Sequence, residues 1–199
     1  MFLQEAGQGA APPGAVVWPA AAILFAAFVT ENATETWSAL HIERTFGAPP
    51  GSGALGPAML GLTMGAGRLG GQMLAARLGE ARLVALSAGV GALGALLVAL
   101  APTQSLAVIG VGLIGAGVAV TVPSANSLLG RRVAPAARAR AISRAWMVGF
   151  TGFFLGPVLM GLIAQGVGLA AAFVAVALVM ASVLPGLARL VRLPDRVAA

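Results

Sequence analysis

Two carboxylates, Glu31 and Glu35, lie within the first long apolar stretch of the sequence. If this stretch is helical, they are one turn apart and share a face. A carboxylate inside a membrane-spanning helix costs several kcal/mol, so it normally faces a water-filled cavity or a partner. Two carboxylates in a poorly hydrated site also favour the protonated form of one of them. The pattern predicts a pathway or ion-coupling role for Glu31, whereas Glu35, nearer the end of the stretch, better fits a hydrated charge at a membrane interface.

Two side-chain amides, Asn32 and Asn126, are further candidates for a polar pathway. Asn32 adjoins Glu31 and either lines the same path or hydrogen-bonds across helices. Asn126 follows Pro123, which frees a backbone carbonyl in any helix that contains it. Its amide and two neighbouring hydroxyls either satisfy such backbone groups or line a cavity; the hydroxyls belong to Ser124 and Ser127.

The sequence contains few of the residue patterns that enzyme catalysis requires. There is no cysteine and only one histidine, His41, so thiolate catalysis and cysteine or histidine metal clusters are excluded. No nucleophile–base pair and no phosphate-binding loop is apparent. The net charge of +6 comes from arginines scattered between uncharged runs, and no nucleic-acid motif accompanies them. We therefore expect no enzyme activity, no cofactor, no metal and no nucleic-acid partner.

The composition indicates an all-α integral membrane protein. The 199 residues are 59% hydrophobic and only 9% charged, whereas a soluble domain carries about 25% charged residues. Because about 20 apolar residues cross the hydrocarbon core, six helices are predicted. They cover residues 16–40, 54–75, 83–100, 106–129, 142–164 and 169–190, joined by loops that include 41–51. Together they form one transmembrane domain over residues 16–192, with Trp37 and Trp146 expected at the membrane interfaces.

Arginines predict the orientation, because positive charge accumulates on the cytoplasmic side. The connections after the second and fourth spans, and the tail, are rich in arginine, while those after the third and fifth carry none. We therefore expect the protein in the inner (plasma) membrane with both termini in the cytoplasm. Residues 1–15 would form a cytoplasmic lead-in and residues 193–199 a cytoplasmic tail. The arginines concerned are Arg77, Arg82, Arg131, Arg132, Arg138, Arg140, Arg144, Arg189, Arg192 and Arg196.

Two glycine-containing motifs are recognisable. Residues 67–82, GRLGGQMLAARLGEAR, resemble the loop signature of the major facilitator superfamily, G-R-x-x-G-x-x-x-D-R-x-G-x-R, although Ala76 stands where that signature has an acid. The resemblance implies a gating loop, and Arg68 either reaches the membrane surface or forms an ion pair of the gate. Residues 149–161 resemble the Gly-Pro helix of the same family, whose role is close packing and bending. The residues carried over are Arg68, Gly71, Arg77, Gly79 and Arg82 for the loop, and Gly152, Gly156, Pro157 and Gly161 for the helix.

The order of these motifs resembles the carboxyl-terminal six helices of a bacterial major facilitator transporter. That resemblance implies two inverted three-helix repeats and secondary active transport of a small solute, with protons as a possible coupling ion. It also implies that the chain needs a second six-helix half, or a second copy, besides the lipid bilayer. The alternatives are a fragment of a split transporter gene and a membrane scaffold or accessory subunit without transport of its own.

Overall fold

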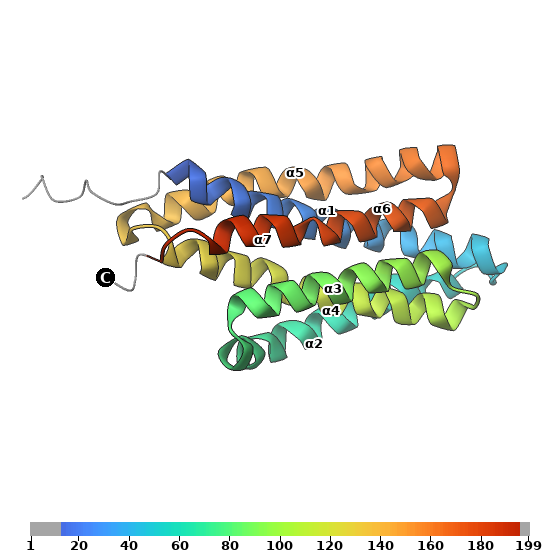
Figure 1. The fold of residues 1–199 in the computed structure, drawn as a ribbon. Coiled ribbons are helices and arrows are strands. Elements are labelled where there is room, and N and C mark those ends of the chain that lie inside the picture. Colours follow the sequence, from blue (N-terminus) through green and yellow to red (C-terminus); the bar gives the residue numbers. More distant parts are fainter. Residues whose placement is uncertain (1–12, 196–199) are drawn as a thin grey trace, which may run out of the picture.

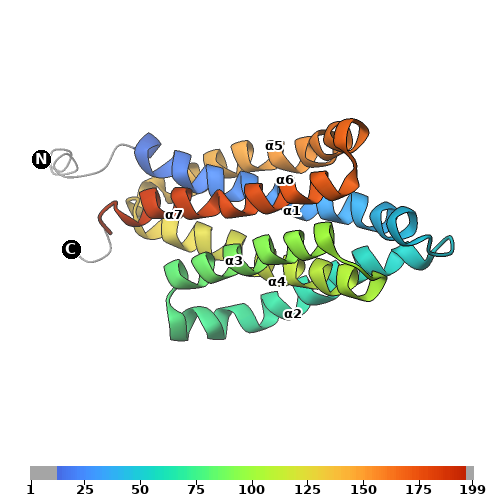
Figure 2. The same ribbon diagram turned by 45° about the vertical axis from the view of Figure 1, so that its right-hand side comes forward.

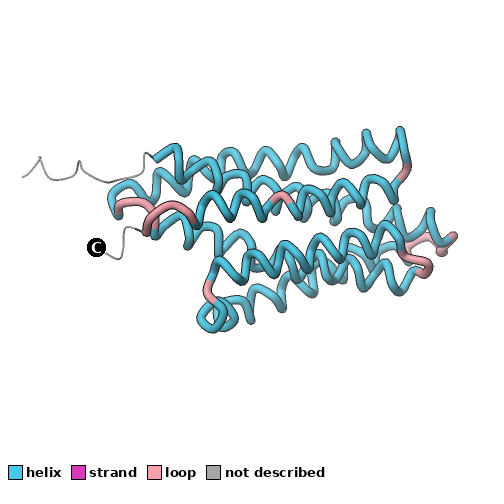
Figure 3. The backbone as a smooth tube through the Cα atoms, in the orientation of Figure 1, coloured by secondary structure: helices cyan, strands magenta, loops and turns pink. Residues whose placement is uncertain are grey.

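The computed structural model describes residues 13–195. Of the expected lead-in at 1–15 and tail at 193–199, residues 1–12 and 196–199 lie outside the described residues, and residues 13–15 belong to the first helix instead of a lead-in. The described residues are helical almost throughout, with short connections (Figure 3). The elements are α1 (Pro13–Phe46), a short 3-10 helix η1 (Ser52–Ala54), α2 (Leu55–Leu78), α3 (Glu80–Leu100), α4 (Gln104–Arg131), α5 (Pro135–Val167), α6 (Leu169–Ala181) and α7 (Val183–Val191).

The long helices run side by side in one bundle (Figure 1). Both the α2–α3 turn and the α4–α5 connection lie at the same end as the start of α1 and the end of α7, and the turned view in Figure 2 agrees. This arrangement gathers the arginines of these connections at one end of the bundle, which we call the arginine-rich end. The connections after α1, α3 and α5 lie at the opposite end.

Close helix contacts rest on small residues. α1 packs along α5, and α4 packs along both α3 and α2. A Cβ added at Gly152 would lie 2.6 Å from the carbonyl oxygen of Phe25, and one added at Gly156 would lie 2.8 Å from that of Val29. Any side chain at these two positions would therefore push α5 away from α1, as expected for an interface held by small residues.

Five segments of the described chain are long and apolar enough to cross a membrane: 14–46, 80–100, 104–131, 135–167 and 169–191. α2 is not among these five segments. It has 24 residues, and at a rise of about 1.5 Å per residue it is also long enough to cross the hydrocarbon core. Its glycines and Arg68 lower its hydropathy.

Helix boundaries depart from the sequence-based expectation at three places. α1 continues through Phe46 instead of yielding to a loop at residue 41, because His41 and Ile42 are buried against the bundle. α5 begins at Pro135, so Arg138 and its two basic neighbours lie in the helix; proline suits the first turn, and alanine and arginine are strong helix formers. The last span is divided at Ser182 into α6 and α7.

Candidate functional site: a polar cavity between α1, α2 and α4

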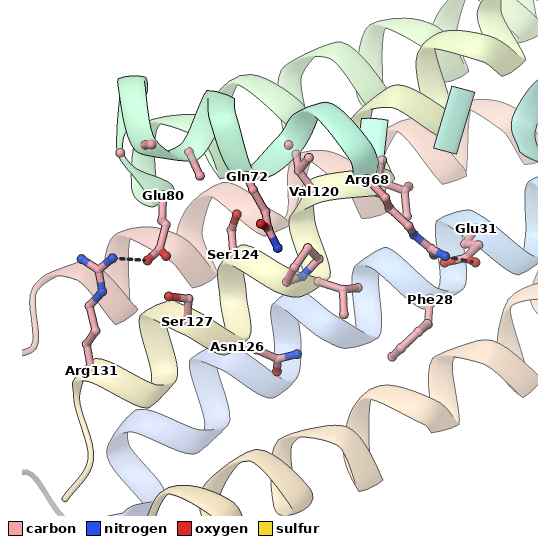
Figure 4. Close-up of a pocket in the computed structure, with 18 of the residues that line it drawn as sticks. Phe28, Glu31, Arg68, Gln72, Glu80, Val120, Ser124, Asn126, Ser127 and Arg131 are labelled. Atoms are coloured by element: carbon pink, nitrogen blue, oxygen red, sulfur yellow. Dashed lines mark ion pairs between the residues drawn. The ribbon is translucent and has the colours of Figure 1, made fainter. Parts of the chain in front are cut away.

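A cavity of about 860 Å³ opens between α1, α2 and α4, with contributions from the starts of α3 and α5. Charged, amide and hydroxyl side chains share its wall with Phe28 (Figure 4), and Trp146 also lines it. The polar lining residues are Glu31, Arg68, Gln72, Glu80, Ser124, Asn126, Ser127 and Arg131. Such a mixture in the middle of an apolar bundle is what a path for a polar solute requires.

Glu31 on α1 and Arg68 on α2 form an ion pair across the cavity. Arg68 Nη2 lies 3.8 Å from Glu31 Oε1, a charge contact too long for a direct hydrogen bond. The Glu31 side chain is 18% exposed and that of Arg68 is 60% exposed. Because hydrated pairs contribute only about 0–1 kcal/mol, this one links α1 to α2 without locking them together. Arg68 was expected either to reach the membrane surface or to form an ion pair, and in the structure it forms the ion pair with Glu31.

A second ion pair stands at the arginine-rich end of the cavity. Arg131 Nη2, from the last turn of α4, lies 3.2 Å from Glu80 Oε2. Glu80 opens α3, where a carboxylate also interacts favourably with the helix dipole. Figure 4 shows the two pairs at opposite ends of the row of cavity side chains. Glu80 follows Ala76 by four residues, so it restores an acidic group to the loop that lacks one at Ala76.

The aromatic wall of the cavity comes from α1 and α5. Trp146 Nε1 donates a hydrogen bond of 3.0 Å to Oδ1 of Asn126 on α4, and the ring of Phe28 meets the indole edge-on at 5.5 Å. From the sequence, Trp146 was expected only as a membrane-interface residue. The structure also places it in the wall of the cavity. Asn126 lines the cavity and at the same time joins α4 to α5.

Asn32 and Trp37 lie at the α1–α5 interface, outside the cavity lining. Asn32 Nδ2 donates to the carbonyl oxygen of Phe153 at 2.6 Å, and Trp37 Nε1 donates to that of Pro157 at 2.9 Å. Of the two roles considered for Asn32, the hydrogen bond across helices is the one observed. Glu35 is exposed and does not line the cavity.

The residues of the loop signature are divided between two places. Gly71 and Gly79 border the cavity together with Arg68. Arg77 instead lines a separate apolar groove, and Arg82 is exposed at the start of α3. Near Pro123, the hydroxyl of Thr121 donates to the Gly117 carbonyl at 2.8 Å.

Several cavity residues had not been singled out as site residues from the sequence. Glu80 stood within the loop signature, and its spacing from Ala76 was an available signal. Phe28 and Gln72 gave none, because a phenylalanine or a lone glutamine in an apolar helix is ordinary. Among residues 13–195 no group of three or more histidine, cysteine or acidic side chains is placed to hold a metal ion.

The fold and the cavity define an all-helical membrane bundle with a polar interior. The sequence matches the model of the Major Facilitator Superfamily over residues 9–199, and the chain belongs to that family of membrane transport proteins. No curated protein matches it. Among solved structures it is similar to a mutant of the peptide transporter POT in complex with sulfate, with 18% identity and a TM-score of 0.78. The match covers 93% of this chain and 38% of that transporter, so the chain spans well under half its length.

Proposed function

We propose that this protein is one six-helix half of a secondary active transporter, equivalent to the carboxyl-terminal half, and that its polar cavity is part of the path of a small solute. The observation that carries the proposal is the pair of opposite charges, Glu31 and Arg68, in the wall of a cavity of about 860 Å³. A charged side chain within a membrane helix supports the hypothesis of a path or a coupling step.

The packing supports six spans in two inverted repeats. If α1 to α3 repeat as α4 to α7, then α1 corresponds to α4 and α2 to α5. The contact of α1 with α5 then has its counterpart in the contact of α4 with α2, and both are extensive. This exchange of partners is expected for inverted repeats and supports α2 as the sixth spanning helix. The arginine distribution supports a cytoplasmic position for the arginine-rich end of the bundle.

Large apolar side chains exposed along α2 and α5 support a requirement for a second half or a second copy. Contiguous exposed apolar surface marks an interaction site or contact with lipid. Both helices flank the cavity, so a partner seated there would complete its wall. The side chains concerned, all more than 60% exposed, are Leu62, Leu69, Met147, Phe154 and Leu162.

Coupling to a proton gradient follows from the weakness of the Glu31–Arg68 contact. Protonation of Glu31 removes its charge, and Arg68 is then attracted to water or to an anionic group of the solute. Deprotonation draws Arg68 back to α1. Movement of the Arg68 guanidinium away from Glu31 would connect proton binding on α1 with the position of α2, a differential contact of the kind that shifts a two-state equilibrium.

The decisive experiment is flux measurement in proteoliposomes with an imposed pH gradient and a library of small solutes. The chain alone should insert and show no solute-dependent flux. Co-reconstitution with a six-helix partner half should produce flux that the gradient drives. Robust transport by the monomer would overturn the half-transporter proposal. A chain that binds another membrane protein stably, yet supports no flux with any partner half, would favour the scaffold or accessory role.

A further inference from the structure

We propose that a groove between α2 and α3, at the arginine-rich end, binds one anionic phospholipid of the bilayer, with an acyl chain in the groove and the phosphate at Arg77 and Arg82. The groove lies beside α2 and is distinct from the polar cavity, although Gly71 and Val120 border both. The inference concerns lipid and does not depend on the proposed transport function.

The shape of the groove follows from helix packing. α2 and α3 each pack along α4 but make little contact with each other, so a groove of about 450 Å³ remains between them. Ala116 and Val120 of α4 line it, and Gly70 widens it, because a Cβ at that position would meet nothing within 4 Å. The space is long and open on one side rather than enclosed, which suits a chain lying along it.

The lining is almost entirely apolar. It consists of methionine, leucine, valine and small residues, and its one hydroxyl, Ser87, is buried. Leu86 and Val90 of α3 continue into an exposed stripe along the same helix, and this stripe carries no charge. Hydrocarbon is the matching occupant for such a surface. The side chains that form the stripe are Leu86, Val90, Leu93, Leu96 and Leu100.

Positive charge closes the groove at the arginine-rich end. Arg77 lines it in the last turn of α2, and Arg82 is exposed in the first turn of α3, next in sequence to the groove-lining Leu83. Glu80, which lies between them in sequence, is drawn toward Arg131 at 3.2 Å. Within residues 13–195, neither Arg77 nor Arg82 has a carboxylate within 4.0 Å. Guanidinium groups bind phosphate well, and a basic pocket between membrane helices is a site for anionic head groups.

The test is titration of the purified full chain in detergent with dioleoyl phosphatidylglycerol, with retained lipid counted by native mass spectrometry. One phosphatidylglycerol should be retained per chain, in preference to phosphatidylcholine of the same acyl chains. The double variant R77Q/R82Q should weaken retention by roughly 25-fold, since each surface arginine contributes about fivefold. The matched control R140Q/R144Q removes two exposed arginines of the same end from α5 and should leave retention unchanged.

A second variant tests the acyl chain. Gly70→Leu fills the groove without touching a charge, and it should reduce retention while helix content and melting temperature stay as in the parent chain. Equal retention of both lipids, equal loss in the control, or full retention in Gly70→Leu would each overturn the proposal. Displacement of the lipid by glycerol phosphate alone would also overturn the proposal, because it would mean that the site binds the head group without an acyl chain.

Discussion

Asn32 donates its side-chain N–H to the carbonyl oxygen of Phe153, the oxygen that Pro157 leaves without a helical donor. Residue 157 should bond the carbonyl four residues earlier, and proline has no N–H to give. The 2.6 Å contact from α1 fills that vacancy. The gap that Pro157 leaves in the hydrogen bonds of α5 is thus filled by a side chain of another helix.

The first prediction concerns this hydrogen bond. Asn32→Ala should destabilise the protein by about 1 kcal/mol, in the range of polar contacts between membrane helices. In a Pro157→Ala background, residue 157 can bond Phe153 itself, so the same substitution should cost much less. Unfolding in mixed micelles measures both, with Thr151→Ala as a control because its hydroxyl bonds only within α5. Equal costs in the two backgrounds would show that the Phe153 carbonyl is not what Asn32 serves.

The second prediction separates the two glutamates. Glu31→Gln keeps shape and hydrogen bonding but removes the charge that meets Arg68. In an assembled transporter it should insert normally and lose gradient-driven accumulation, while exchange or passive equilibration survives. Glu35→Gln should do less, because that side chain is exposed and lies outside the cavity lining. Flux in proteoliposomes with and without a pH gradient checks this, and pH-dependent accumulation that survives in both Glu31→Gln and Glu31→Ala would remove Glu31 from the coupling step.

The third prediction concerns water in the cavity. The chain has no cysteine, so single cysteines report without interference. Gln72→Cys should react with a membrane-impermeant maleimide, because Gln72 lines an open cavity. Ser38→Cys should stay unlabelled, since Ser38 is fully buried. Leu93→Cys, on the apolar stripe of α3, should react only with a lipid-soluble reagent, and labelling of that position by the impermeant reagent would contradict the placement of α3 against lipid.

The fourth prediction compares glycines. Gly156→Leu should prevent α1 and α5 from closing, since even a Cβ would lie 2.8 Å from the Val29 carbonyl oxygen. Overpacking costs about 1–3 kcal/mol or more, and folded yield in detergent should fall sharply. Gly65→Ala is the control, because its Cβ meets nothing within 4 Å and alanine favours a helix by about 1 kcal/mol. Similar yields from the two variants would mean that the close approach of α5 is not required.

The fifth prediction is topology, and the structure moves its insertion points. Arg138, expected in a loop, lies in α5, so a reporter belongs at Ala134 in the α4–α5 connection. Reporters there and after Arg196 should both indicate the cytoplasm. Insertions at Thr103 and Gly168, in the connections at the opposite end, should indicate the outside. Two reporters on the wrong side would rule out six spans.

Helix existence was predictable because long apolar runs have few other solutions in lipid. Helix boundaries were less predictable. His41 was expected at the start of a loop, but its ring is buried with its centroid 4.9 Å from that of Phe173, and α1 continues past it. The family was predictable from the spacing of glycine, arginine and proline, and the family match confirms it.

The site was predictable only in part. Glu31 was identified from the sequence because a carboxylate within an apolar membrane helix is energetically costly and is usually functional. Its neighbour Asn32 is also polar but faces α5, and the direction of a side chain depends on helix packing rather than on residue type. The partners of Glu31 and Trp146 come from helices distant in sequence, so Arg68 and Asn126 could be named as candidates but not paired.

The reliance of α1 on α5 also has a consequence for synthesis. Asn32 and Phe153 are 121 residues apart, and a ribosome needs about 6–24 s to bridge that distance. During this interval α1 carries the amide of Asn32 and the indole N–H of Trp37 with no α5 to receive them. Such a helix is poorly suited to lipid, so it must stay at the protein-lined exit or the wet membrane surface until α5 emerges. α1 is in this way synthesised before α2, α3 and α4, yet it reaches its final position only after them.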